Sequence, residues 1–294
     1  MVGCHALIPY KDEIFETLEF VADNANAATR ACAIFNGAWL NNVDKQRAFD
    51  LYLRMVKDYN PLLLAIPFHN GHPLLYHTHI DYEKLVPFFT KAITIEEAGT
   101  PMSFFLFNAY LNDKSHALDL LKTLLNNNVK SGQDLLWYIC AHILDDKRHS
   151  EKGWIIIDYL LDFDDKELGE KLNNCFLQIP AKIDDNLKFF LDKYVKSPIS
   201  QYKNSYFYDF LRKLIPFDSE QCLVWFFASN PNDFKHDFYD ESPLNVLIEA
   251  YNGIREYGKN NPILVKAMDT FDSLLQIPQY RNVHLRAFLK ELST

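Results

Sequence analysis

Apolar residues recur at helical spacing along almost the whole chain, and this pattern limits what the chain can fold into. Leu85, Phe88, Phe89 and Ala92 follow one another at helical intervals, whereas runs of strict alternation between apolar and polar residues are scarce. An amphipathic helix has one apolar side, so a chain built from such segments packs helix on helix. The sequence therefore predicts an all-α protein without a central sheet.

Capping residues mark where the predicted helices start. A capping side chain stands before a proline at Thr100-Pro101, Ser197-Pro198, Ser242-Pro243 and Asn261-Pro262, and Asn60-Pro61 is a fifth candidate. The predicted helices are Lys11–Asp23, Ala25–Trp39, Val43–Asp58, Tyr82–Ile93, Pro101–Leu111, Ser115–Asn126, Gln133–Leu144, Glu151–Leu161, Lys166–Leu177, Asp184–Val195, Gln201–Ile215, Ser219–Ala228, Pro243–Glu256, Pro262–Gln276 and Val283–Leu292.

The predicted helices are short and joined by brief polar turns, such as Asn126 to Lys130. Consecutive helices are then antiparallel neighbours, and pairs recur at roughly 35 to 45 residues, as in HEAT and armadillo repeats. We expect one helical-repeat domain over residues 1–294, an α-solenoid of antiparallel helix pairs. The helix Trp154–Leu161 is apolar almost all round, which predicts neighbours on several sides.

Charge and cysteine usage restrict the function. Lys and Arg number 30 against 39 Asp and Glu, a net charge of -9, so nucleic acid is an unfavourable partner. Five scattered cysteines include no CxxC pair, which favours a reducing compartment. No apolar run has the length of a membrane span, so we expect a cytoplasmic protein without a membrane partner.

One segment has the glycine and lysine spacing of a phosphate-binding P-loop. Gly253, Gly258 and Lys259 occupy these positions, but Asn260 replaces the Ser or Thr that would reach magnesium. A working P-loop follows a buried strand and opens a helix, whereas Gly253 lies inside a predicted helix and Gly258 resembles its C-terminal stop. We therefore expect no nucleotide cofactor here.

A cluster of histidines raises the alternative of a metal-dependent hydrolase. His69, His72, His77, His79 and Asp81 lie within one loop-like stretch, and imidazole and carboxylate groups are common metal ligands. Surface histidines beside the Asn70-Gly71 turn would give the same pattern. No distant motif completes a site, so we expect no metal, and the hydrolase remains an alternative.

Other catalytic signals have structural explanations. Cys140 and Cys175 have apolar helical neighbours, which raise a thiol pKa and make the thiol inert. The aspartate pairs Asp145-Asp146, Asp164-Asp165 and Asp184-Asp185 fall at predicted helix starts or loops, where negative charge complements the helix dipole. The sequence carries no catalytic motif, so we do not expect an enzyme.

An aromatic segment is the candidate binding surface. Its tyrosines alternate with cationic residues, and tyrosine is favoured at interfaces because it buries much area with few rotatable bonds. The candidate protein-binding residues are Tyr202, Lys203, Tyr206, Tyr208 and Arg212. Two alternatives stay open: a helix that packs with its tyrosines half-buried, and a local basic patch of a HEAT-like DNA-binding or repair protein.

Two segments near the C-terminus resemble a known family. Leu247–Tyr251 is an apolar segment that ends in tyrosine, and Met268, Asp269, Asp272, Leu274 and Leu275 form an acid-spaced LDxxDxLL-like pattern. These segments resemble the closing helices of the helical C-terminal region of bacterial STAND NTPases, with Met268 for the usual leucine. Residues 26–56 and 164–176 are similar to that family's HEAT-like units.

The resemblance implies a function and a cellular role. In that family this region recognises a foreign protein, while an upstream ATPase oligomerises. The chain would then be a fragment, a separate subunit or a free-standing repeat protein that lacks the ATPase. We therefore expect a protein-binding sensor or scaffold. The resemblance implies a role in antiviral defence, with a foreign protein such as a phage protein as the partner.

Overall fold

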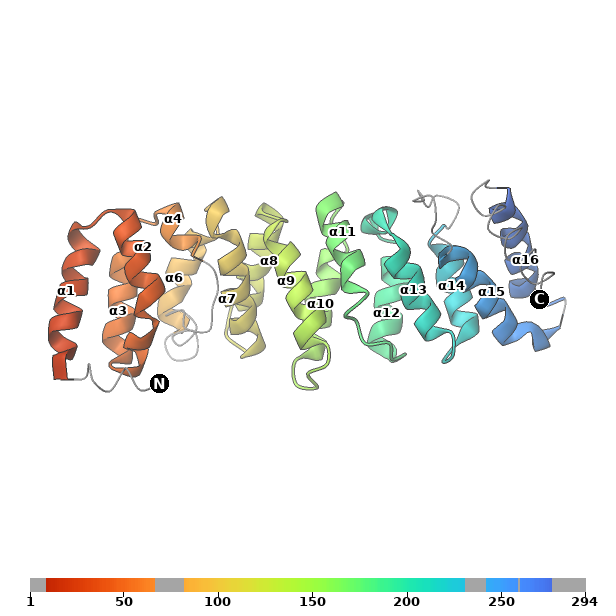
Figure 1. The fold of residues 1–294 in the computed structure, drawn as a ribbon, viewed down its shortest axis with the longest axis horizontal. Helices are drawn as coiled ribbons and strands as arrows, with labels where there is room; N and C mark the ends of the chain where they lie inside the picture. The colour runs from red at the N-terminus through yellow and green to blue at the C-terminus, as the bar shows by residue number, and fades with distance from the viewer. Residues whose placement is uncertain (1–8, 67–81, 231–241, 259, 277–294) are drawn as a thin grey trace, which may run out of the picture. The chain divides into compact units, whose positions relative to one another are not determined.

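The computed structural model describes residues 9–66, 82–230, 242–258 and 260–276 (Figure 1). Every described element is a helix, and these residues contain no strand, which confirms the predicted all-α class. The contacts divide the chain into two units, Met1–Leu135 and Leu136–Thr294. A single domain over the whole chain stays a prediction.

In the first unit, helices that are close in the sequence pack on one another. They are α1 (Lys11–Asn24), α2 (Ala27–Asn36), η2 (Gly37–Asn42), α3 (Lys45–Met55), α4 (Pro61–Leu64), α6 (Tyr82–Ala92), η3 (Glu96–Ala98), α7 (Gly99–Leu111) and α8 (Ala117–Asn127), and α9 (Ser131–Tyr138) includes the boundary. Helix α1 packs on α3, and α7 packs on α6 and α8.

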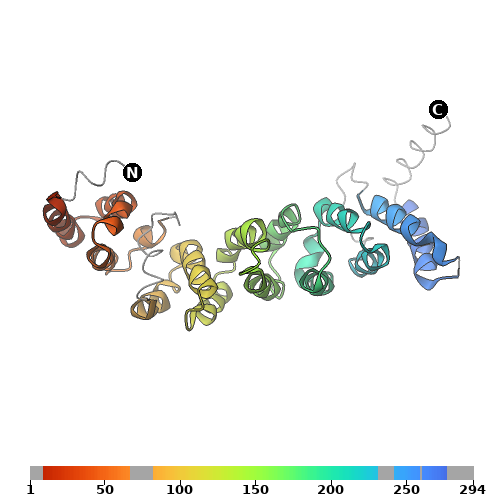
Figure 2. The same cartoon turned by 90° about the horizontal axis from the view of Figure 1, so that it is seen from below.

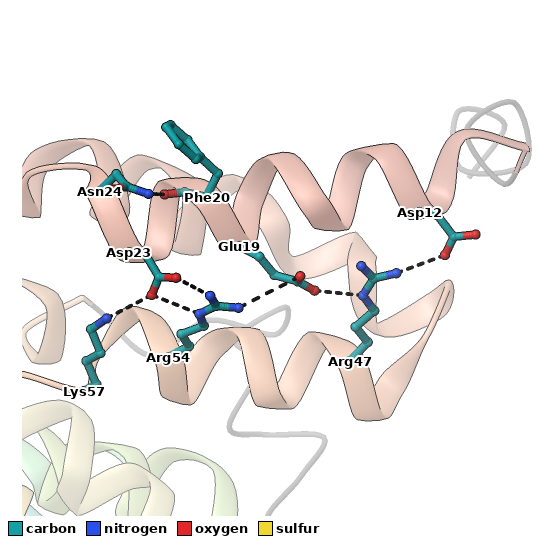
Figure 3. Close-up of polar contacts among 8 residues, drawn as sticks. All are labelled: Asp12, Glu19, Phe20, Asp23, Asn24, Arg47, Arg54 and Lys57. Carbon is teal, nitrogen blue, oxygen red and sulfur yellow. Dashed lines mark hydrogen bonds and ion pairs between the residues drawn. The ribbon is translucent and has the colours of Figure 1, made fainter.

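An ion-pair ladder joins α1 to α3 (Figure 3). The guanidinium of Arg47 bonds Asp12 at 2.9 Å and Glu19 at 2.8 Å, and Arg54 and Lys57 both bond Asp23. Hydrogen bonds from Arg54 and Lys57 hold the pKa of Asp23 well below its usual range. Because these side chains are partly exposed, water and salt screen the pairs, and the ladder fixes register more than it adds stability.

The second unit holds the longer series of helices. They are η4 (Ile139–Ile143, a π-helix), α10 (Ser150–Leu160), α11 (Lys166–Cys175), α12 (Asp185–Tyr194), η5 (Pro198–Tyr202), α13 (Ser205–Leu214), α14 (Ser219–Ala228), α15 (Ser242–Ile254), η7 (Arg255–Tyr257) and α16 (Pro262–Leu275). Figure 2 views most of them nearly end-on. Helices α10, α12 and α14 begin at residues 150, 185 and 219, which are 35 and 34 residues apart.

Alternate helices of this unit contact each other. Helix α10 packs on α12, α14 packs on α16, and α13 packs on both α11 and α15. The core between them is aromatic: Phe176 lies within 5.1 to 6.0 Å of the rings of Phe190, Tyr194, Phe207 and Phe210. Such pairs prefer tilted and edge-on geometries, and these rings adopt them.

Several predicted helix starts are confirmed by their caps. The side chains of Asn60 and Asn261 accept hydrogen bonds from the backbone amides of Leu62 and Ile263. Asp165 and Asp184 likewise cap α11 and α12 through Leu168 and Leu187. One aspartate of each of these two pairs therefore serves as a cap, as expected.

Several predicted boundaries were wrong, and three of them have a clear local cause. Helix α7 begins at Gly99, before the Thr100-Pro101 pair, because the turn η3 leads directly into it. Ser197 has no capping bond, and Pro198 opens the 3-10 turn η5. The segment Gln201–Ile215 is not one helix, because the Asn204 side chain accepts from the Tyr206 amide and restarts the chain as α13.

Helix α10 departs from the expectation of neighbours on several sides. Ile156, Ile157, Leu160 and Leu161 are buried, but Ile155 keeps 39% of its surface exposed. The helix therefore has one solvent face that carries an apolar side chain. The predicted helix Val283–Leu292 lies outside the described residues.

Candidate functional site

An apolar groove lies between α15 and α16. Its volume is about 350 Å³. Leu247, Ile248, Tyr251 and Asn252 line it from α15, and Ala267, Met268, Phe271 and Asp272 line it from α16. We call this feature the α15–α16 groove.

Local sequence fixes the two helices that form the groove. The Ser242 hydroxyl bonds Asp209 of α13 at 3.1 Å, which ties the start of α15 to the preceding helices. Gly258 has φ +90, a left-handed conformation that glycine adopts without strain, and it ends the turn η7 after α15. Asn261 and Pro262 then start α16. The chain therefore reverses within a few residues, and α16 packs on α15.

Among the described residues, α16 buries one side and leaves apolar side chains of another side exposed. Leu264, Ala267 and Leu274 are buried, whereas Val265 is 44% and Met268 is 55% exposed. Burying such an apolar side chain fully is worth about 1.5 to 3 kcal/mol relative to leaving it exposed. A partner that covered the groove would gain part of this free energy.

The groove is mainly apolar, and Tyr251, Asn252 and Asp272 bring polar groups to its lining. The amide of Asn252 can donate and accept, and the carboxylate of Asp272 can accept from an amine or an amide. A concave apolar site with a few polar groups is typical of peptide and small-molecule binding. The arrangement suits binding, and it places no nucleophile beside a base.

The structure gives Tyr202 a packing role. Its hydroxyl bonds Asp164 at 3.1 Å, and its ring lies so close to Gly169 that a Cβ there would approach Tyr202 Cδ2 to 2.7 Å. Desolvation, followed by the bond to Asp164, raises the pKa of Tyr202. The buried Asn173 amide also donates to the Tyr202 carbonyl at 2.5 Å. Tyr202 therefore joins η5 to α11.

The other predicted binding residues are not gathered on one surface. Tyr208 is fully buried, with its ring 5.2 Å from Phe207 and 5.9 Å from Phe226, so it belongs to the core. Arg212 bonds Glu249 of α15 at 2.6 Å. Tyr206 is 36% exposed, and Lys203 is half-buried. The sequence pattern that indicated a buried helix here is the apolar stripe of Phe207, Phe210, Leu211 and Leu214. All four of these residues are buried along α13.

The P-loop-like segment has no P-loop geometry in the described residues. Gly253 lies within α15, and Gly258 follows η7 at the end of that helix. Asn260 is exposed, and Lys259 lies outside the described residues. Gly253 serves helix packing instead, because a Cβ there would lie 2.2 Å from Ser219 Oγ of α14.

The metal and thiol candidates can be placed only in part. The histidines from His69 to His79 and Asp81 lie outside the described residues. Among the residues that are described, no group of three or more His, Cys, Asp or Glu could hold a metal ion.

Burial raises the pKa of Cys222 to about 12 and that of Cys140 well above its usual value, so both stay protonated thiols.

No family model, curated protein or solved structure matches the chain. The resemblance to the STAND NTPases therefore rests on the quoted segments alone. Within the part of the chain that the structure describes, no helix is long and apolar enough to cross a membrane.

Proposed function

We propose that this chain is a protein-binding helical-repeat protein, and that the α15–α16 groove receives an apolar segment of its partner. The observation that carries the proposal is the exposed apolar lining of the groove, above all Met268 at 55%. Apolar surface left open beside a well-packed core is typical of a binding site.

The architecture that we propose is an α-solenoid of the HEAT or armadillo kind. Support comes from side-chain pairs that join alternate helices at nearly constant sequence separation. Lys193 bonds Asp158, 35 residues earlier, and Arg212 bonds Glu249, 37 residues later. In repeat proteins each unit packs on its neighbours in this way, and the stack supplies an extended surface for recognition.

The family resemblance supports a more specific role. Leu247, Tyr251, Met268 and Asp272 carry the resemblance to the STAND NTPases, and the same four residues line the α15–α16 groove. We therefore propose that the groove is part of a target-recognition region for a foreign protein, such as a phage protein, in the cytoplasm. The DNA-binding alternative gains no support, because Arg212 of the basic patch is bonded to Glu249. The hydrolase alternative gains none from the described residues, which hold no group of three or more His, Cys, Asp or Glu for a metal ion.

Affinity capture with matched variants tests the proposal. The purified chain, Met268→Lys and Phe217→Lys are used to capture proteins from phage-infected and uninfected bacterial cells. Phe217 is 66% exposed and lies between α13 and α14, so its variant has a similar charge change away from the groove.

We expect a protein that is captured by the wild type and by Phe217→Lys, and lost in Met268→Lys. Loss in both variants would indicate non-specific adhesion through exposed apolar side chains. Capture of the same protein by Met268→Lys would show that this protein does not bind in the α15–α16 groove. Both variants should melt like the wild type, because both positions are exposed.

A further inference from the structure

Three exposed apolar residues occupy matching positions on α10, α12 and α14. Ile155 is 39%, Phe189 is 63% and Val224 is 44% exposed. They are 34 and 35 residues apart in the sequence, close to the 35 and 34 residues that separate the starts of the three helices. We call these three residues the α10–α14 row.

Contacts between α10 and α12 fix the direction of the first two side chains. The rings of Trp154 and Phe190 face each other across 5.2 Å, and one turn further along Asp158 bonds Lys193 at 2.9 Å. The two helices are therefore parallel and in register. Each residue of a helix is turned about 100° from the one before it. The residue after Trp154 and the residue before Phe190 therefore point to the same side of the helix pair. These residues are Ile155 and Phe189.

The third residue follows from the contact between α12 and α14. The indole of buried Trp225 donates to Asp192 at 2.7 Å, so Trp225 faces α12. Val224 precedes Trp225 by one residue, as Phe189 precedes Phe190. Since the chain reverses twice between α12 and α14, the two helices run the same way, and Val224 points to the side of Phe189. The three side chains therefore form a row across three helices.

The spacing of the row selects a helical partner. Packed helices lie about 8 to 10 Å apart, and seven residues of a helix rise about 10.5 Å. Apolar residues at every seventh position of a crossing helix would therefore meet the row in turn. An extended strand advances about 10 Å in three residues, but its third residue points to the opposite face.

A polyproline helix is the remaining geometry with a suitable repeat, about 9.3 Å per three residues. Its docking sites are grooves lined by aromatic side chains. The α10–α14 row holds one aromatic and two aliphatic residues, which favours an α-helical partner.

The side of the helices that carries the row is acidic. Asp158, Asp162 and Asp192 lie on it with one cation, Lys193, which bonds Asp158 and Asp162. By helical geometry, the carboxylates of Glu151, Asp185 and Glu220 also lie on this side. The cations Lys152 and Lys196 lie there too, so the carboxylates remain in excess. This excess of negative charge favours Lys and Arg beside the apolar residues of a partner.

We propose that the α10–α14 row docks a basic amphipathic helix of a partner protein, with apolar residues at every seventh position. This inference goes beyond the proposed function, since it concerns a different surface and a defined class of partner. It does not depend on what binds the α15–α16 groove.

A designed peptide provides the probe. It has about 18 residues, which span about 27 Å as a helix, with Leu at every seventh position and flanking Lys and Arg. Binding of the labelled peptide to the full chain is measured by fluorescence anisotropy. The comparison peptides are a scrambled sequence of the same composition and a proline-rich peptide with the same charge. The protein variants are Phe189→Ser and Phe217→Ser, which have similar exposure, 63% and 66%.

We expect saturable binding of the designed peptide that is at least about tenfold weaker in Phe189→Ser and unchanged in Phe217→Ser. Both variants should keep the wild-type melting temperature. The proposal is overturned if the designed peptide does not bind, if the scrambled peptide binds equally well, or if both variants weaken binding alike. Tighter binding of the proline-rich peptide would also overturn it. Met268→Lys should leave the affinity unchanged, so a failure here is distinct from a failure at the groove.

Discussion

The indole nitrogen of Trp225 on α14 donates a hydrogen bond to the carboxylate of Asp192 on α12 across 2.7 Å. Trp225 is itself fully buried, whereas Asp192 lies at the surface. The bond thus connects the buried side of α14 to the solvent-exposed side of α12.

The first prediction concerns this bond. Trp225→Phe removes the donor and part of a buried ring, and we expect a loss of about 1 to 3 kcal/mol in the free energy of unfolding. Urea denaturation measures it. Asp192→Asn keeps an acceptor at the same place and should cost clearly less. Equal losses in the two variants would mean that the charge of Asp192, and not the bond, supports the contact.

The second prediction compares adjacent residues of α10. Ile156 is fully buried and Ile155 is 39% exposed. Ile156→Ala should lower the free energy of unfolding by about 2 to 5 kcal/mol, because it removes buried methyl groups and leaves a cavity. Ile155→Ala removes the same atoms from a solvent face and should cost less than about 1 kcal/mol. Similar losses at both positions would show that Ile155 is covered in solution.

The third prediction concerns acid. A hydrogen bond from the Arg148 amide, then one from the His149 ring, lowers the pKa of Asp146 to about 2. Because the folded-state pKa is below the unfolded value, this stabilisation is present above about pH 4 and is lost as the pH falls toward 2. Asp146→Asn should therefore melt lower at pH 5, with a smaller difference from the wild type at pH 2. A difference that stayed constant across this range would contradict the assignment.

The fourth prediction concerns thiol reactivity. Cys32 is exposed, whereas Cys222 is buried and its pKa is raised to about 12. Iodoacetamide at pH 8 should alkylate Cys32 in the folded protein and should reach Cys222 only after denaturation, because the thiolate is the reactive form. Peptide mass spectrometry gives the extent at each site. Rapid alkylation of Cys222 in the folded protein would show that α14 opens.

Local signals allowed the all-α class and several helix starts to be predicted from the sequence. Asn261-Pro262 starts α16 as expected, because a cap depends on residues that are close in the chain. The same locality explains the error at Gln201–Ile215. There the apolar pattern runs through Asn204, but the cap made by that side chain interrupts the helix.

The candidate site was harder to predict, because it depends on distant residues. Tyr208 and Tyr206 look alike in the sequence, yet the former is enclosed by Phe207 and Phe226 and the latter is partly exposed. The α15–α16 groove brings Tyr251 and Met268 together from two helices. Their pattern marked them as helical, but only tertiary contacts decide that Met268 stays exposed.

Gly253 has a consequence for the groove on the other side of its helix. A turn of about 100° per residue places Gly253 opposite Ile248 and Tyr251, so α15 touches Ser219 of α14 with one side and lines the groove with the other. Any side chain at position 253 would act as a spacer that shifts α15 away from α14. Gly253 therefore determines the width of the α15–α16 groove, although it lies on the opposite side of α15 and does not contact what binds in the groove.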